Sequence, residues 1–135
     1  LIDSMSSYSS ELDADGIVAI DARGFIFGSL LAFKLQKPLV IARKKNKLPG
    51  NLITQEYVLE YGKDSLSIQK EALDGLQKFI IVDDLLATGG TAKCVGELLN
   101  SQNKDVISLI TIIELKSLSG RNNLNFPVHS ELKYD

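Results

Sequence analysis

The stretch from Ile80 to Thr91, IIVDDLLATGGT, decides most of what the sequence predicts about the fold. Its apolar start is typical of a strand that is covered on both faces of a sheet, and two adjacent aspartates follow. A buried carboxylate without a partner would cost several kcal/mol, and ligands of open parallel sheets bind at the carboxyl ends of strands. We therefore expect Asp83 and Asp84 to end a strand and to face a cleft, where they hold a cation, hydroxyl groups or both.

The five residues from Ala87 to Thr91 predict a phosphate cradle. They are small or carry hydroxyl groups, so backbone N–H groups can approach an anion, and a helix is expected to begin at about Gly90. Asp-Asp or Gly-Gly alone would more simply be an ordinary turn in which Asp and Thr cap the helix. The full string is far more specific. The sequence contains neither G-x-x-x-x-G-K-[ST] nor, after a strand, G-x-G-x-x-G, which excludes the P-loop and dinucleotide-binding interpretations.

Short apolar runs alternate with amphipathic stretches on both sides of this string, which is typical of β-α-β units. We predict strands over residues 17–20, 39–42, 79–82 and 106–113, and helices over residues 1–12, 25–35 and 90–100. In the second helix, Phe27, Leu30 and Leu31 are expected to point inward. The pattern predicts a parallel sheet with helices on both faces.

The region between the second and third of these strands has a different pattern. Side chains alternate over residues 57–61 and 65–68, and residues 62–64 form a predicted turn. This predicts an antiparallel hairpin that projects from the parallel core as a flexible flap. We expect one α/β domain over residues 1–135, and we expect the native beginning to be missing because the chain opens on Leu1 without a signal-peptide pattern.

Composition excludes several classes of function. A net charge of −2 over 135 residues offers no broad footprint for nucleic acid or anionic membranes, so any attraction for phosphate must be local. A single cysteine excludes an internal disulfide framework and fits the cytoplasm, and no apolar run reaches the roughly 18 residues of a membrane span. With one cysteine and one histidine, a zinc site is excluded. We expect Cys94 to pack inward and His129 to have no catalytic role.

The string from Ile80 to Thr91 resembles the phosphoribosyl diphosphate signature of the type I phosphoribosyltransferases. Three further segments resemble the adenine phosphoribosyltransferase family, in its order and spacing: residues 19–28 (AIDARGFIFG), 43–50 (RKKNKLPG) and 59–62 (LEYG). The resemblance extends to residues 114–121 and covers nearly the whole chain. It implies the type I phosphoribosyltransferase fold without the family's N-terminal segment, which covers the base. Asn46 stands where the family commonly has glycine.

The resemblance also implies an activity. The family transfers a 5-phosphoribosyl group from phosphoribosyl diphosphate to adenine and releases AMP and diphosphate. Mg²⁺ would be the cofactor, held through substrate and water with no direct protein ligand. A homodimer and a cytoplasmic location are implied as well, with Arg43 reaching the neighbouring subunit's site.

The family's site residues carry over as follows. Asp83 and Asp84 would bind the ribose hydroxyls, and Ala87, Thr88, Gly89, Gly90 and Thr91 the 5′-phosphate. Arg23, Arg43, Lys44 and Lys47 would bind diphosphate, Glu60 and Tyr61 would be catalytic, and Leu115 would contact the base. Without the resemblance, Arg23 and the basic run are more typical of a solvated surface. Glu60 is then equally typical of the exposed face of a strand.

Three alternatives stay open. A regulatory domain that binds phosphoribosyl diphosphate without catalysis would keep residues 83–91 but would lose the basic flap, which is intact here. A phosphoacceptor receiver domain also has paired acids, but it needs a further Asp and a Lys at later strand ends, and Glu114 and Leu115 follow the fourth strand instead. Within the enzyme class, another purine could be the acceptor.

Overall fold

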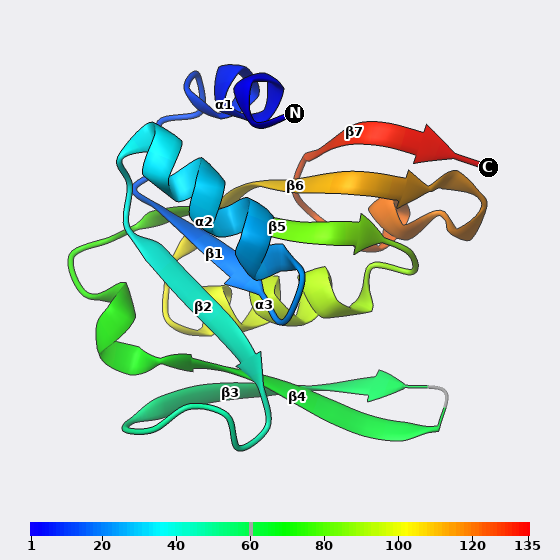
Figure 1. Cartoon of the computed structure of the whole chain (residues 1–135). Coiled ribbons are helices and arrows are strands. Elements are labelled where there is room, and N and C mark those ends of the chain that lie inside the picture. Colours follow the sequence, from blue (N-terminus) through cyan, green and yellow to red (C-terminus); the bar gives the residue numbers. More distant parts are fainter. Residues whose placement is uncertain (60) are drawn as a thin grey trace.

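The computed structural model describes residues 1–59 and 61–135. These residues form one seven-stranded sheet in the order β3-β4-β2-β1-β5-β6-β7, with helices against it (Figure 1). The strands are β1 (Gly16–Ile20), β2 (Leu39–Lys44), β3 (Leu52–Leu59), β4 (Gly62–Gln69), β5 (Lys78–Leu86), β6 (Asp105–Leu115) and β7 (Val128–Tyr134). The α-helices are α1 (Ile2–Ser9), α2 (Gly24–Leu35) and α3 (Gly90–Ser101), and three short 3₁₀ turns are η1 (Lys70–Leu73), η2 (Lys116–Leu118) and η3 (Gly120–Asn123).

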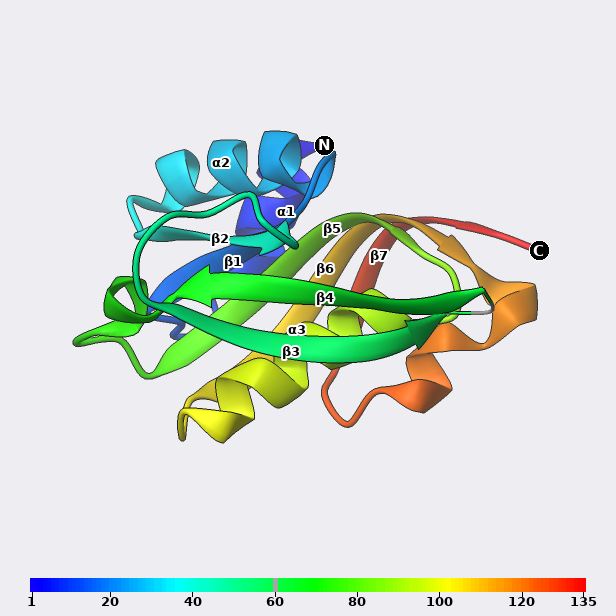
Figure 2. The same cartoon turned by 90° about the horizontal axis from the view of Figure 1, so that it is seen from below.

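The sheet has a parallel core and an antiparallel extension. β2, β1, β5, β6 and β7 run parallel, whereas β4 pairs antiparallel with β2 and with β3. The predicted parallel core and the predicted hairpin are therefore confirmed. Seen from below, the hairpin lies in front of the parallel core, and β3 contacts α3 (Figure 2). β7 was not predicted, because residues 128–134 show neither an apolar run nor a clear alternation.

Alternating side chains of the central strands build two apolar layers. Ile17 and Ile80 point to the face that α1 and α2 cover, and their neighbours Val18 and Ile81 point to the face that α3 and the hairpin cover. Every residue of β1 is buried. This double coverage explains why the central strands are continuous apolar runs.

Two predicted details are wrong. Leu30 was expected to point inward, but it is 48% exposed, while Leu31 is fully buried. α2 approaches the sheet through Gly28, where an added Cβ would lie 2.5 Å from the Cβ of Ala19, and this close contact rotates Leu30 toward solvent. The predicted turn at residues 62–64 already belongs to β4, because Leu59 pairs with Gly62 at the end of the hairpin.

Within residues 1–59 and 61–135, none of the helices has the length and apolar character needed to cross a membrane.

Candidate active site

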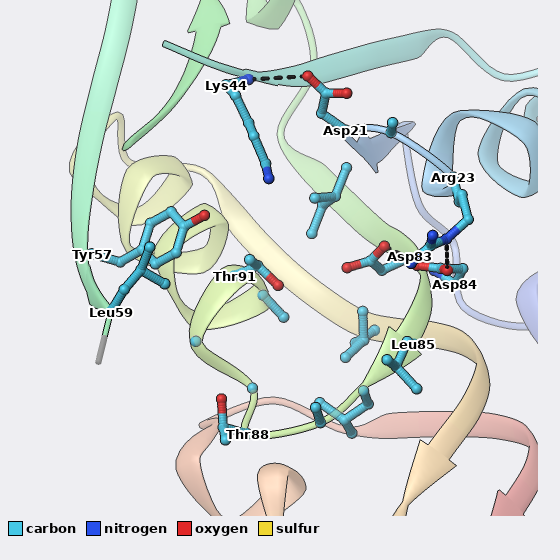
Figure 3. A pocket seen from close by; sticks show the side chains of 18 of the residues that line it. Asp21, Arg23, Lys44, Tyr57, Leu59, Asp83, Asp84, Leu85, Thr88 and Thr91 are labelled. Carbon is cyan, nitrogen blue, oxygen red and sulfur yellow. Dashed lines mark hydrogen bonds and ion pairs between the residues drawn. The ribbon is translucent and has the colours of Figure 1, made fainter. Parts of the chain in front are cut away.

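A cavity of about 450 Å³ opens where β1, β2 and β5 end. Its wall consists of the turn after β1, the end of β2, the second half of β5, the loop before α3 and the end of β3 (Figure 3). It brings together most of the predicted site residues, namely Arg23, Lys44, Asp83, Asp84, Ala87, Thr88, Gly89, Gly90 and Thr91. Parallel strands that end at one edge of a sheet gather these residues from positions far apart in the chain.

The paired aspartates lie inside β5 rather than after it. The prediction that the strand ends at Val82 is wrong, since β5 continues to Leu86. Its pairing with β1 nevertheless ends at Val82, while its pairing with β6 continues to Leu86. From Asp83 onward, the edge of β5 that paired with β1 is no longer covered by that strand and borders the cavity. The carboxylates therefore have the predicted access to the cleft.

The pKa values of the two carboxyl groups are shifted in opposite directions. Asp83 is 9% exposed, and its burial, together with the hydrogen bond and negative charge of Asp84, raises its pKa well above the usual range. Burial is the largest influence on Asp84 and opposes its ionisation, but the hydrogen bonds with Arg23 and Asp83 and the charge of Arg23 together outweigh burial and lower the pKa of Asp84. The Arg23 Nε donates to Asp84 Oδ2 at 2.5 Å. At neutral pH the pair therefore holds about one proton, and a bound cation would favour the loss of that proton from Asp83.

The loop from Ala87 to Gly89 connects β5 directly to α3. Gly89 has φ +91°, a conformation that glycine adopts without strain, and it is the N-cap residue of α3. The loop residues and the first residues of α3 line the cavity, so the N-terminal, positive end of the helix lies at the cavity wall. This arrangement has the chemistry of the predicted phosphate cradle.

The turn that carries Arg23 is held close to Asp83 and to β2. An added Cβ on Gly24 would lie 2.9 Å from the Val82 carbonyl oxygen, so glycine permits this approach. The Asp21–Ala22 peptide bond is cis. Asp21 Oδ2 accepts a hydrogen bond from the Lys44 backbone N–H at 3.2 Å and lies 3.5 Å from Arg43 Nε. Asp21 thus ties the start of the basic segment to the Arg23 turn.

Four predicted site residues do not line the cavity. Arg43 pairs with Asp21, and its guanidinium lies 5.8 Å from the centre of the Phe25 ring. Lys47 follows on the exposed part of the basic segment, and Tyr61 is 94% exposed. Leu115 pairs with Tyr134 at the end of β6. Glu60, the predicted catalytic acid-base group, lies outside the described residues.

Tyr57 and Leu59 line the cavity instead, opposite Arg23 and Asp84 (Figure 3). They share one face of β3 because side chains alternate along a strand. Tyr57 is partly buried, and burial followed by the charge of Asp64 raises its pKa to about 12, so its hydroxyl group stays protonated. The alternation of residues 57–61 was the available signal, but it did not show which face would meet the cavity.

Cys94 behaves as predicted. It lies in α3 with 2% exposure, and its thiol donates to the Gln55 carbonyl oxygen at 3.3 Å. Burial raises its pKa to about 11, which makes the thiolate scarce at neutral pH. His129 lies far from the cavity, where it stacks on Tyr8 with a centroid distance of 4.2 Å and pairs with Glu131.

Known proteins match almost the whole chain. The phosphoribosyl transferase domain family matches residues 4–128. An adenine phosphoribosyltransferase of Prochlorococcus marinus strain AS9601 is 58% identical over 126 residues, which cover 93% of this chain and 74% of that protein. The chain belongs to the adenine phosphoribosyltransferase family. The family enzyme of strain MIT 9211 is 54% identical, over 98% of this chain and 77% of that protein.

Solved structures of this family have the same fold. The adenine phosphoribosyltransferase of Thermoanaerobacter pseudethanolicus superposes with a TM-score of 0.88 at 40% identity, over 98% of this chain and 80% of that one. The Saccharomyces cerevisiae enzyme, solved with an imino-altritol bisphosphate and adenine, gives a TM-score of 0.89 at 38% identity, over 97% and 77% of the two chains. The predicted type I phosphoribosyltransferase fold and the enzyme class, a pentosyltransferase, are confirmed.

Proposed function

We propose that this protein transfers the 5-phosphoribosyl group from phosphoribosyl diphosphate to N9 of adenine, with AMP and diphosphate as products, as a step of purine salvage. One observation carries the proposal. One cavity is lined by an acidic pair, by the loop of small residues before α3, and by the two cations Arg23 and Lys44. These groups match, in order, the hydroxyl groups, the 5′-phosphate and the diphosphate of one donor molecule. The names of its relatives support adenine as the acceptor.

Asp83 and Asp84 bind the ribose hydroxyls, and the loop from Ala87 to Thr91 binds the 5′-phosphate through its backbone amides. The hydroxyl groups of Thr88 and Thr91 add further donors at the cavity wall. Both ends of the phosphoribosyl group are then fixed, so binding energy remote from C1 orients the reacting carbon.

Arg23 and Lys44 bind the diphosphate from the opposite side. A guanidinium forks onto two phosphate oxygens, and the Lys44 ammonium adds a point charge. Arg43, near the end of β2, and Lys47, in the segment that follows β2, join the site when this basic segment closes over the donor. Closure would also keep water from C1, where water would hydrolyse the donor.

Mg²⁺ fits this site as a substrate-bound ion. Among the described residues, no three His, Cys, Asp or Glu side chains gather into a metal cage. Asp83 and Asp84 supply two adjacent carboxyl groups at the cavity wall, and Mg²⁺ is commonly held by one or two carboxylates together with phosphate oxygens and water. When bound with the donor, the ion would neutralise charge on the diphosphate.

The reaction separates charge within the cavity. The C1–O bond breaks and its electron pair leaves with diphosphate, while N9 of adenine forms the new bond to C1 with inversion. Arg23 and Lys44 stabilise the negative charge that develops on the leaving group, which is the usual contribution of preorganised cations. The proton of N9 passes to Glu60, and Tyr61 closes the site over it. Tyr57 and Leu59 supply apolar surface for the purine at the cavity wall. Leu115, which does not line the cavity, would reach the base only when the site closes.

The protein acts as a homodimer in the cytoplasm. One stripe of α2 supports the dimer, since Ile26, Leu30 and Phe33 are spaced so that they share a face and are 57%, 48% and 85% exposed. Apolar stripes of this kind mark protein interfaces. We assign this stripe to a second copy of the chain. The single cysteine, buried and reduced, fits a cytoplasmic location.

The deciding experiment offers each of four bases to the full chain. Adenine, hypoxanthine, guanine and xanthine are incubated separately with phosphoribosyl diphosphate and Mg²⁺, and nucleotides are separated by chromatography. AMP from adenine, with little product from the other bases, is the expected result. Product from another purine would show that this purine, and not adenine, is the acceptor. Donor binding without any product would favour the regulatory domain.

A further inference from the structure

The 3₁₀ turn η3 packs directly against the loop that precedes α3, although about thirty residues separate them in the chain. An added Cβ on Gly120 would lie 2.2 Å from the Ala87 carbonyl oxygen, and one on Gly89 would lie 2.8 Å from the Gly120 carbonyl oxygen. The φ angle of Gly120 lies outside the left-handed region, so space rather than backbone conformation requires glycine there. The two backbones are in contact, and a side chain at either glycine would separate them.

Asn123 holds one carbonyl group of this loop. Its Nδ2 donates to the Thr88 carbonyl oxygen at 2.8 Å. The loop's peptide bonds are trans, so the N–H that follows a carbonyl group points the opposite way. With the Thr88 carbonyl turned toward Asn123 and the Ala87 carbonyl turned toward Gly120, the amides of Gly89 and Thr88 point away from η3.

Asn123 and the cavity lie on opposite sides of the loop. Asn123 lines a separate groove with Lys93 and Phe126, whereas Thr88 and Gly89 line the cavity. The amides that point away from η3 therefore point to the cavity. A phosphate cradle needs this arrangement, with carbonyl groups directed outward and N–H groups directed inward.

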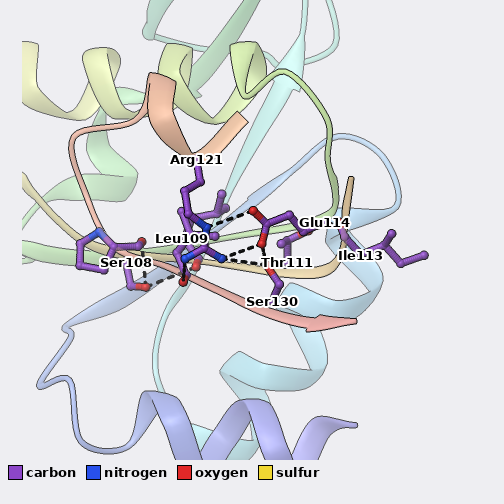
Figure 4. A network of polar contacts seen from close by, with 9 residues as sticks. Ser108, Leu109, Thr111, Ile113, Glu114, Arg121 and Ser130 are labelled. Atoms are coloured by element: carbon purple, nitrogen blue, oxygen red, sulfur yellow. Dashed lines mark hydrogen bonds and ion pairs between the residues drawn. The ribbon is translucent and has the colours of Figure 1, made fainter. Parts of the chain in front are cut away.

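Arg121 anchors the turn to the sheet (Figure 4). Its Nε and Nη2 donate to the two carboxylate oxygens of Glu114 at 3.0 and 2.6 Å, and its Nη1 donates to the Val128 carbonyl oxygen at 3.1 Å. Ser130 Oγ donates to Glu114 Oε1 at 2.6 Å. Glu114 is paired in register with Leu86, the last residue of β5 before the loop. The contacts thus close a ring from β5 through β6 and η3 back to the loop.

We infer that η3 is the outer wall of the phosphate loop and that Asn123 is a positioning residue for recognition of the 5′-phosphate. Asn123 does not touch the ligand. It acts by holding the Thr88 carbonyl group, so that the N–H of Gly89 in the same peptide unit points to the phosphate. Gly120 allows η3 to approach the loop closely, and Arg121 fixes η3 to the sheet. This inference rests on the proposed function of the loop.

The test compares Asn123→Ala with Asn122→Ala, a change of the adjacent exposed residue, which donates no side-chain hydrogen bond within the described part of the chain. Ribose 5-phosphate and Mg²⁺-diphosphate are titrated separately into each protein by calorimetry, and the KM for phosphoribosyl diphosphate and the kcat are measured. We expect Asn123→Ala to weaken ribose 5-phosphate and to raise this KM by about 3- to 10-fold, the loss of one hydrogen bond. The affinity for diphosphate should stay within twofold, the melting temperature should fall by no more than the loss of one hydrogen bond explains, and Asn122→Ala should match the unaltered chain.

Two results would overturn the inference. If Asn123→Ala binds ribose 5-phosphate as tightly as Asn122→Ala does, η3 has no influence on the loop. If the affinity for diphosphate falls in parallel, the damage is general and not confined to the phosphate loop. Failure of the unaltered chain to bind ribose 5-phosphate is a distinct outcome, because it would overturn the proposed function together with the inference.

Discussion

Arg23 donates from Nε to Asp84 Oδ2 at 2.5 Å at one side of the cavity (Figure 3). The contact joins a residue that we assign to the diphosphate with one that we assign to the ribose hydroxyls. When the donor binds, this ion pair must therefore open, so that Arg23 contacts the diphosphate and Asp84 contacts the ribose hydroxyls of the same molecule. Arg23 is largely exposed in the pair, with 75% of its side chain accessible, so water screens the interaction and its loss costs little.

The exchange predicts a selective effect of Arg23→Ala. We expect kcat/KM to fall by about 100-fold, because a cation that stabilises the leaving group is lost. Binding of Mg²⁺-diphosphate should weaken, whereas ribose 5-phosphate, which lacks the diphosphate, should bind nearly as before. Steady-state kinetics and calorimetry measure both quantities. Lys70→Ala, which removes a cation from η1 outside the cavity, is the control. Equal weakening of both ligands would contradict the assignment.

The buried carboxyl group of Asp83 predicts a trade-off between stability and activity. Its folded pKa is raised, so the native state holds a proton that the unfolded chain has lost, and stability decreases as pH rises from about 4 toward that folded pKa. Asp83→Asn removes this cost. We expect it to increase the free energy of unfolding at pH 7 by about 1 to 3 kcal/mol, measured by urea denaturation, while activity is lost.

Asp84→Asn is the matched control for Asp83→Asn. The pKa of Asp84 is lowered in the folded state, so its charge stabilises the protein above the usual aspartate range. Replacing it should not increase stability at pH 7. Equal increases in stability for both variants would contradict this assignment. An increase for Asp83→Asn that does not vary with pH would also show that the burial of Asp83 lacks the electrostatic cost that we assign to it.

Glu114 predicts the opposite dependence on pH. The hydrogen bond from Arg121 outweighs the opposing effect of burial and lowers the pKa of Glu114 to about 2. The stabilisation is present above the unfolded value of about 4.3 and is lost as pH falls through the folded pKa. We expect Glu114→Gln to be less stable at pH 6 and to approach the unaltered chain between pH 4 and pH 2. Urea denaturation across this range checks it, and a difference that stays constant with pH would count against the ion pair.

The exposed stripe on α2 predicts the oligomeric state. Phe33→Glu places a charge where we assign the second copy, so the variant should be monomeric at a concentration at which the unaltered chain is a dimer. Light scattering after size-exclusion chromatography measures the mass. Leu118→Glu, in η2, should leave the mass unchanged. A dimer that survives Phe33→Glu would move the interface to another surface.

Local patterns explain which parts of the fold and site were predictable. β5, the loop and α3 follow from consecutive residues, because an apolar run and small residues act over a few positions. Leu30 was misplaced because the helix turns on its contact at Gly28, which depends on Ala19 in another element. Periodicity alone cannot choose among the apolar faces of a helix that is hydrophobic over most of its length.

Long-range polar contacts were the least predictable part of the site. The bond from Asn123 to Thr88 spans 35 positions, and nothing in the pattern around Asn123 distinguishes it from Asn122. The contact of Asp21 with Lys44 likewise depends on the strand order, with β1 beside β2. Such pairs exist only once the sheet is assembled, which is why the sequence indicated the ligand-facing residues but not those that hold them in place.

The most direct test of the central claim follows the reaction by ³¹P nuclear magnetic resonance. The full chain is mixed with phosphoribosyl diphosphate, Mg²⁺ and an equal amount of adenine. We expect the donor signals to be replaced by those of AMP and free diphosphate in equal amounts. Donor signals that persist, or that give way to ribose 5-phosphate and diphosphate without AMP, would contradict it.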